Sequence, residues 1–220
     1  MDYGKAFTFV FDDEEWVQKI VIGGILSLIP IVNLIVLGYG LKVLKNVADG
    51  EEKPLPEWDD FADYFVQGLV SSLGGLVWAL PVIFLWIVMI ALTVPISAVT
   101  GYGPEPEYVS VPVNLCMSGL GCLSSLYGLF LAVVMPAATT KYAVSREFGA
   151  FFRVGEIFNY ITSNLGPYII ALLLGLVAGF IAGFGLIFCI VGVVFTGFWA
   201  SLVSNYLLGQ VYRESVTPSP

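Results

Sequence analysis

Acidic and aromatic side chains gather in the segment 42–63, where their types and spacing could do chemistry. The group consists of Glu57, Trp58, Asp59, Asp60 and Asp63. Hard divalent cations take several carboxylate oxygens as ligands, so this loop is a candidate site for a cation or for a partner protein. Its spacing is not that of an EF-hand, and Asp59 or Asp60 can instead cap a helix that follows. We therefore favour capping and solvation over metal binding, and we predict no metal site.

The residue types on which most enzymes rely are scarce in this chain. It has no histidine, which removes the commonest general base and the commonest metal ligand. The three cysteines, Cys116, Cys122 and Cys189, lie in uncharged stretches without a C-x-x-C spacing, as small apolar core residues do. We expect no catalytic residue and no cofactor, and we predict that the protein is not an enzyme. A membrane enzyme that uses the acidic loop with a metal is the least favoured alternative.

A second pattern is a stripe of small residues near the C-terminus. Its members are Ala171, Gly175, Gly179 and Gly183. Small residues four apart let two helices in a membrane approach closely. We expect this stripe to be a helix-packing face, either within the chain or against a partner subunit, rather than the lining of a pore.

Both patterns belong to a chain whose apolar stretches need lipid as their solvent. The sequence is 58% hydrophobic and 12% charged, with a mean hydropathy of +0.89, and it carries no charge in residues 20–41, 64–104, 108–140 and 157–212. Inside a bilayer only helices and closed barrels satisfy the backbone, and these runs lack the alternation of barrel strands. We predict an all-α integral membrane bundle, with spans near 20–41, 70–96, 113–138, 164–183 and 187–209.

The longest run, 157–212, has to fold back on itself. As one helix it would be about 84 Å long, roughly three times the hydrocarbon thickness of a bilayer. The glycine-rich stretch from Gly179 to Gly185 is the natural bending place. We therefore predict a helical hairpin here.

The first run, 20–41, has two interpretations. It fits one tilted span by length, which is the interpretation we favour and which gives five crossings. Pro30 lies at its centre, so a hairpin that turns there is the alternative, and it gives six. A weak internal repeat supports the hairpin, since Val17-Gln18 before Gly23-Gly24 and Pro30 resembles the later Val66-Gln67 before Gly74-Gly75 and Pro81.

Three amphipathic segments are expected at the membrane surface, near 12–19, 58–68 and 144–160. In the first, Asp12 or Asp13 can cap a helix, and Trp16 and Lys19 suit the depth of the lipid headgroups. Loops 42–63 and 139–156 contain Lys and Arg, whereas the loop 101–112 has neither. The positive-inside rule then predicts that both basic loops and the C-terminus, with its polar tail 214–220, are cytoplasmic in a cell membrane.

The net charge of −8 disfavours nucleic acid as a partner, because such binding needs a basic surface. An acidic surface with few lysines is typical of proteins in high salt, so we expect a halophilic source. Ionisable residues are absent from the long apolar runs, which argues against an ion-coupled pump. The lipid bilayer is the one partner that the composition requires.

Five motifs spread along the chain carry a resemblance to a known family. They are GGILSLIPIVN from Gly23 to Asn33, Gly38-Tyr39, Asp49-Gly50-Glu51, LPEWDD from Leu55 to Asp60, and GQVYR from Gly209 to Arg213. Together they resemble the DUF4013 family of prokaryotic, largely archaeal membrane proteins, and LPEWDD is the most specific part. The resemblance implies a polytopic membrane protein and assigns no activity to any residue.

The function that these patterns favour is a non-enzymatic membrane scaffold or accessory subunit. Such a protein would hold a membrane partner or a second copy of itself through its small-residue face and its acidic loop. A transporter or channel for a small or amphipathic solute is the alternative, because helices broken by proline can expose backbone to a substrate.

Overall fold

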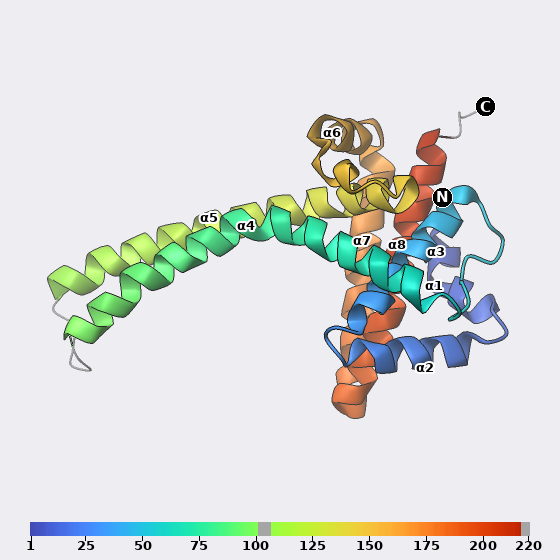
Figure 1. Cartoon of the computed structure of the whole chain (residues 1–220), viewed down its shortest axis with the longest axis horizontal. Coiled ribbons are helices and arrows are strands. Elements are labelled where there is room, and N and C mark those ends of the chain that lie inside the picture. Colours follow the sequence, from blue (N-terminus) through green and yellow to red (C-terminus); the bar gives the residue numbers. More distant parts are fainter. Residues whose placement is uncertain (101–106, 217–220) are drawn as a thin grey trace. The chain divides into compact units, whose positions relative to one another are not determined.

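The computed structural model describes residues 1–100 and 107–216, and every regular element in these ranges is a helix (Figure 1). This confirms the predicted all-α class. Within the described ranges, four helical segments are long and apolar enough to cross a membrane. They are Phe61–Ala91, Met117–Ser145, Leu165–Ile187 and Gly192–Val216. The number of crossings stays a prediction.

The chain divides into two compact units. The first comprises Met1–Gly74 and the chain from Val134 onward, and the second is Gly75–Val133. Within the described residues, the first unit contains six whole α-helices and parts of two others. They are α1 (Tyr3–Thr8), α2 (Trp16–Ser27), α3 (Asn33–Asp49), α6 (Val154–Ser163), α7 (Leu165–Gly183) and α8 (Cys189–Val216), with the start of α4 (Phe61–Thr100) and the end of α5 (Glu107–Ser145).

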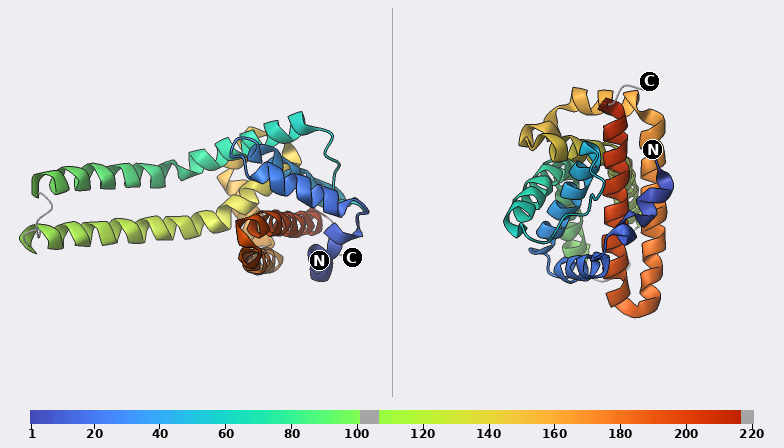
Figure 2. Two further views of the ribbon diagram at one scale, coloured as in Figure 1. Left: turned by 90° about the horizontal axis from the view of Figure 1, so that it is seen from below. Right: turned by 90° about the vertical axis from the view of Figure 1, so that its right-hand side faces the viewer.

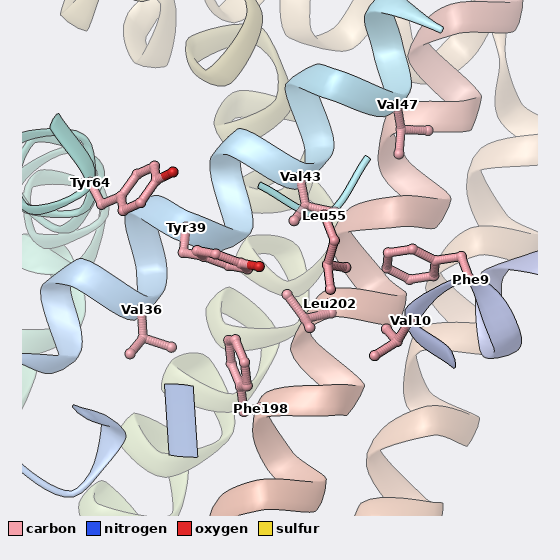
Figure 3. Packing of buried hydrophobic residues seen from close by; sticks show 10 residues of the cluster. All are labelled: Phe9, Val10, Val36, Tyr39, Val43, Val47, Leu55, Tyr64, Phe198 and Leu202. Atoms are coloured by element: carbon pink, nitrogen blue, oxygen red, sulfur yellow. The ribbon is translucent and has the colours of Figure 1, made fainter. Parts of the chain in front are cut away.

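The core of the first unit lies where α3 packs against α8, with the N-terminal segment beside them. Figure 3 shows Tyr39 and Phe198 entering this core from α3 and α8. The centroids of their rings lie 5.9 Å apart. The buried cluster also includes apolar residues from the short 3₁₀ helix Phe9–Asp12 and from the loop before α4. Its members are Phe9, Val10, Val36, Tyr39, Val43, Val47, Leu55, Tyr64, Phe198 and Leu202.

Helices α7 and α8 form an antiparallel hairpin, which Figure 2 shows most clearly in its right-hand view. A 3₁₀ turn, Phe184–Phe188, joins them close to the predicted bend. The hydroxyl of Thr196 on α8 donates to the carbonyl of Ala182 on α7 at 2.7 Å, and so fixes the two helices next to the turn. Both helices begin and end within a few residues of the predicted spans, except that α8 continues to Val216.

Residues 20–41 are not the single helix that we favoured. Helix α2 ends at Ser27, the chain turns through residues 28–32, and α3 begins at Asn33. Pro30 has no N–H to donate and disfavours a helical conformation in the residue before it, which explains the break. The segment is therefore the helical hairpin of the alternative interpretation. The 12 residues of α2 span about 18 Å, too short for a full crossing.

Helix α4 is continuous over 40 residues, so the expected surface segment 58–68 and the span near 70–96 belong to one helix. Its length of about 60 Å exceeds one upright crossing. Within the second unit, the hydroxyl of Tyr127 on α5 donates to the carbonyl of Trp78 on α4 at 2.9 Å. The expected loop 101–112 lies partly outside the described residues, and so does the C-terminal tail from residue 217 onward.

The other two surface segments are helical, with bounds that differ from the prediction. Helix α2 begins at Trp16, after the acidic residues, rather than at Asp12 or Asp13. The segment 144–160 divides into the end of α5, a 3₁₀ turn Phe148–Phe152, and α6. Helix α6 is amphipathic, because Ile157, Tyr160 and Ile161 are buried on one face of it.

Candidate functional site

The acidic loop is anchored at both ends by helix caps. Gly50 ends α3 in the left-handed conformation, with φ of 84°, and the N–H of Glu51 bonds the carbonyl of Asn46 at 2.9 Å. This is the glycine-terminated helix end that satisfies the last carbonyls. At the other end, the carboxylate of Asp60 accepts the N–H of Asp63 at 3.1 Å and caps α4. Of the two predicted capping residues, Asp60 is the one that caps.

Lys19 is the centre of this site, and it is buried among side chains of the first unit; its depth at the lipid headgroups stays a prediction. Only 2% of its surface is exposed, and its ammonium donates to Asp13 at 2.8 Å and to Glu57 at 2.6 Å. Burial by itself would lower the pKa of Lys19, but the two carboxylates outweigh it and raise the pKa above its ordinary value. The N-terminal segment, α2 and the acidic loop are thereby joined through one cation.

Asp13 is held by the same contacts from the other side. Its second oxygen accepts the N–H of Glu15 at 2.8 Å. Partial burial acts to raise the pKa of Asp13, yet the hydrogen bonds from Lys19 and from the Glu15 N–H lower it below the ordinary value. The carboxylate therefore stays ionised at neutral pH.

Trp58 and Tyr39 form the aromatic part of the site. Their rings stack with centroids 4.0 Å apart at 15°, and the indole N–H of Trp58 donates to the carbonyl of Lys19 at 3.2 Å. The hydroxyl of Tyr39 donates to the carbonyl of Pro56 at 2.8 Å, and that of Tyr64 to the carbonyl of Glu57, also at 2.8 Å. Trp58 is thus a packing residue of the first unit.

An open cleft of about 700 Å³ lies over this network. Its lining contains eight carboxylates but only two lysines, Lys42 and Lys53. The carboxylates belong to Asp13, Glu14, Glu15, Glu51, Glu57, Asp59, Asp60 and Asp63. Among the described residues, no three Asp, Glu, Cys or His side chains come together in a way that could hold a metal ion. The cleft is a strongly negative surface.

Asp63 faces a different partner from the rest of the loop. Its two carboxylate oxygens lie 3.0 and 3.2 Å from one guanidinium nitrogen of Arg146, which follows the end of α5. Arg146 has φ of 59° and donates its backbone N–H to the carbonyl of Tyr142 at 2.8 Å. It therefore ends α5 in the left-handed conformation that glycine usually takes.

The predicted small-residue stripe does not stay on one face. Ala171 is buried, and a methyl group added at Gly175 would lie 3.1 Å from the hydroxyl oxygen of Ser204 on α8. A methyl group at Gly179 or Gly183 would meet nothing within 4 Å in the described part of the chain. The reason is geometric: a spacing of four residues advances the stripe by about 40° per step, so that it turns away from its neighbour.

Helix α7 meets α8 through a seam that alternates steps of four and three residues. The seam contains Ala171, Gly175, Ala178 and Ala182, and its three alanines are at most 5% exposed. Such alternation follows one face of a helix of 3.6 residues per turn. Sequence reasoning missed Ala178 and Ala182 because it followed the spacing of four alone.

With this geometry established, comparison with known proteins identifies the family. Residues 22–191 match the family described as "Protein of unknown function (DUF4013)". The chain belongs to the DUF4013 family. No curated protein and no solved structure gives a significant match.

Four glycines lie where helices touch. A methyl group at Gly38 of α3 would lie 1.8 Å from the carbonyl oxygen of Tyr64 on α4, and one at Gly209 of α8 would lie 2.6 Å from that of Leu44 on α3. Gly23 and Gly24 of α2 accommodate the rings of Phe198 and Phe195 on α8. These four glycines therefore allow close contacts that a side chain would disturb.

The residues that sequence reasoning missed in this DUF4013 chain are the partners of the acidic loop. They include Lys19, Asp13, Tyr39 and Tyr64, of which the first lies 38 residues from Glu57 in the sequence. The sequence contains one indication that Lys19 could pair with carboxylates, because it is a single cation between an acidic cluster and a long apolar run. The pairing itself depends on the fold.

Proposed function

We propose that this DUF4013 chain is a non-enzymatic membrane scaffold or accessory subunit whose negative cleft receives a positively charged segment of a partner protein. Its apolar helices are compatible with a membrane protein. The observation that carries the proposal is the structural use of the LPEWDD segment, which lies within the range that matches the family. In LPEWDD, Leu55 is buried, Glu57 and Trp58 hold Lys19, and Asp60 caps α4.

These residues stabilise the fold below the cleft, and we call this rigid base the platform. In an enzyme or a carrier, the characteristic side chains point into a cavity instead. The carboxylates that remain free for a partner line the cleft above the platform. Glu14, Glu51 and Asp59 line it and have neither an ion pair nor a side-chain hydrogen bond within the described residues. Eight carboxylates against two lysines favour a partner that is basic there.

The transporter alternative lacks comparable support, because α3 and α8 pack through a core filled by side chains. In our proposal the cleft faces the cytoplasm, following the distribution of Lys and Arg along the chain. The acidic surface would also suit a halophilic cell, and the bilayer in question would be the cell membrane.

The decisive experiment is native mass determination of the protein extracted from its own membranes in mild detergent. We expect a co-purifying subunit that is lost from the triple variant Glu14→Gln, Glu51→Gln, Asp59→Asn. The matched control Asp49→Asn, Glu52→Gln, Glu147→Gln removes as many charges outside the cleft and should retain the subunit. A protein that comes out alone, or a subunit retained equally by both variants, would contradict the proposal.

The free part of the small-residue stripe offers a second contact for a partner or a second copy. We expect Gly179→Leu to weaken assembly without unfolding the chain, since the added side chain meets no described residue. Gly175→Leu is the comparison variant, because its side chain would clash with Ser204 of the same chain and should lower the stability of the fold itself. Assembly unaffected by Gly179→Leu would remove this helix from the proposed interface.

A further inference from the structure

A separate polar pocket of about 280 Å³ lies where α5, α6, α7 and α8 end or begin. It contains Lys141, whose ammonium lies 5.3 Å from the ring centroid of Tyr160 and 5.8 Å from that of Tyr212. Within the described part of the chain, these aromatic faces are its neighbours and no carboxylate pairs with it. An ammonium held by two aromatic rings keeps its N–H donors available for an anion.

A second donor of this pocket has no hydrogen-bond partner among residues 1–100 and 107–216. Tyr160 is 5% exposed and lines the pocket, and its buried hydroxyl makes no hydrogen bond within these ranges. A buried hydroxyl left unpaired is costly, so an acceptor that reaches it is stabilised. Burial raises the pKa of Tyr160, which keeps the hydroxyl protonated and able to donate.

The remaining lining suits an anion despite one carboxylate. Asn159, Ser163 and Ser215 are neutral groups with N–H or O–H donors. Glu156 is the acidic member, and its carboxylate lies 4.0 Å from the guanidinium of Arg153, which also pairs with Glu147. Asn164 directly precedes α7, so the positive end of a 19-residue helix also lies at the pocket.

The position of the pocket along the chain indicates where the anion comes from. Three of the apolar segments long enough to cross a membrane end at it, since Lys141, Asn164 and Ser215 lie at or next to the ends of Met117–Ser145, Leu165–Ile187 and Gly192–Val216. Such ends lie at the depth of lipid headgroups. From there the exposed side chains of Leu165, Ile169 and Leu176 continue along α7 as an apolar path.

We propose that this pocket binds the phosphate of a membrane lipid headgroup, with Lys141 as the cation and the Tyr160 hydroxyl as a buried donor. The acyl chains then lie on the exposed apolar residues of α7. A pocket of this size holds a headgroup rather than a whole lipid. The proposal involves no residue of the acidic cleft, so either can fail without the other.

Native mass spectrometry of the purified full chain in detergent tests this with three probes. They are dioctanoyl phosphatidylglycerol, dioctanoylglycerol, which has the chains without the phosphate, and inorganic phosphate. We expect the chain to bind the phospholipid at least about tenfold more tightly than either other probe. Equal binding of dioctanoylglycerol would overturn phosphate recognition, and equal binding of inorganic phosphate would overturn the lipid assignment.

Two variants and one control assign the binding to this pocket. Lys141→Met should weaken phospholipid binding at least about tenfold, and Tyr160→Phe by about three- to tenfold. Tyr160→Phe keeps the ring and removes only the unpaired hydroxyl, so it remains informative where Lys141→Met folds poorly. Lys45→Met removes a lysine that is paired with Asp49 outside the pocket and should bind as the parent does. Unchanged binding by Tyr160→Phe and a folded Lys141→Met would overturn the proposal.

Discussion

The two units of the chain are stabilised by different means. The first unit has its own core, in which Tyr39 and Leu202 are fully buried, together with the ion network of Lys19. In the second unit, the described side chains of α4 and α5 are largely exposed, with Phe84, Leu126 and Leu129 each more than 60% accessible. Its helices meet through Trp78, Tyr127 and Phe130. The first unit is therefore specified by its own side chains, whereas the exposed apolar side chains of the second are compatible with lipid as their surroundings.

Substituting one glycine in each unit should produce the largest contrast. In Gly38→Ala the new methyl group would lie 1.8 Å from the carbonyl oxygen of Tyr64, so α3 and α4 would have to separate. We expect a loss of more than about 3 kcal/mol, or no folded protein. Gly128→Ala in the second unit meets nothing within 4 Å among the described residues and should be neutral or stabilising by up to about 1 kcal/mol. Thermal unfolding in detergent measures both, and equal stabilities would contradict the comparison.

Breaking the ion network should have the next largest effect. Lys19→Met leaves Asp13 and Glu57 facing each other without their cation, and we expect a loss of about 2–4 kcal/mol. The estimate stays below that of a fully buried triad because the Glu57 side chain is 61% exposed. Lys45→Met is the matched control, since it breaks the partly exposed pair with Asp49 and should cost at most about 0.5 kcal/mol. Unfolding midpoints that agree for the two variants would show that the network is not a stabilising element.

The same network should make the first unit sensitive to acid. The pKa of Asp13 is lowered in the folded chain, so its contribution is complete above the ordinary value of about 3.9 and is lost as the pH falls below it. The raised pKa of Lys19 affects stability at alkaline pH. The stabilisation by Lys19 persists up to about pH 10.4 and is lost as the pH rises through the raised pKa. In Asp13→Asn, the free energy of unfolding should therefore fall less steeply as the pH is lowered, which unfolding measurements over a series of pH values would show. An unchanged slope in this variant would assign the loss to other carboxylates.

The sequence predicted the helices well, because charge and hydropathy determine where a chain can enter lipid. It favoured the wrong interpretation of residues 20–41, since length alone does not weigh the effect of Pro30 against a full span. It did not predict the partners of Lys19 for a related reason. The fold brings the carboxylates of Asp13 and Glu57 to this lysine from separate segments, and no local spacing indicates that pairing.

The contact between α7 and α8 also shows what the sequence pattern did not predict. Spacing identified Ala171 and Gly175 as contact residues, and it continued to Gly179 and Gly183 because both are small. The helix rotates by about 100° per residue, so its true seam passes through Ala178 and Ala182 instead. Composition thus indicates which helices can pack closely, and only the register of two helices decides which residues touch.

The smallest predicted effect concerns Arg146, where α5 ends and the chain has returned from the second unit. Its φ of 59° costs any residue with a Cβ about 1 kcal/mol, while its ion pair with Asp63 is about one-third exposed on both sides and contributes about 0–1 kcal/mol. Arg146→Gly loses the pair and removes the strain, so we expect nearly unchanged stability. Arg146→Ala loses the pair and keeps the strain, and it should unfold with about 1 kcal/mol less stability than Arg146→Gly. Chemical unfolding in detergent compares the two variants directly. Equal stability would mean that the left-handed turn is not imposed on this position.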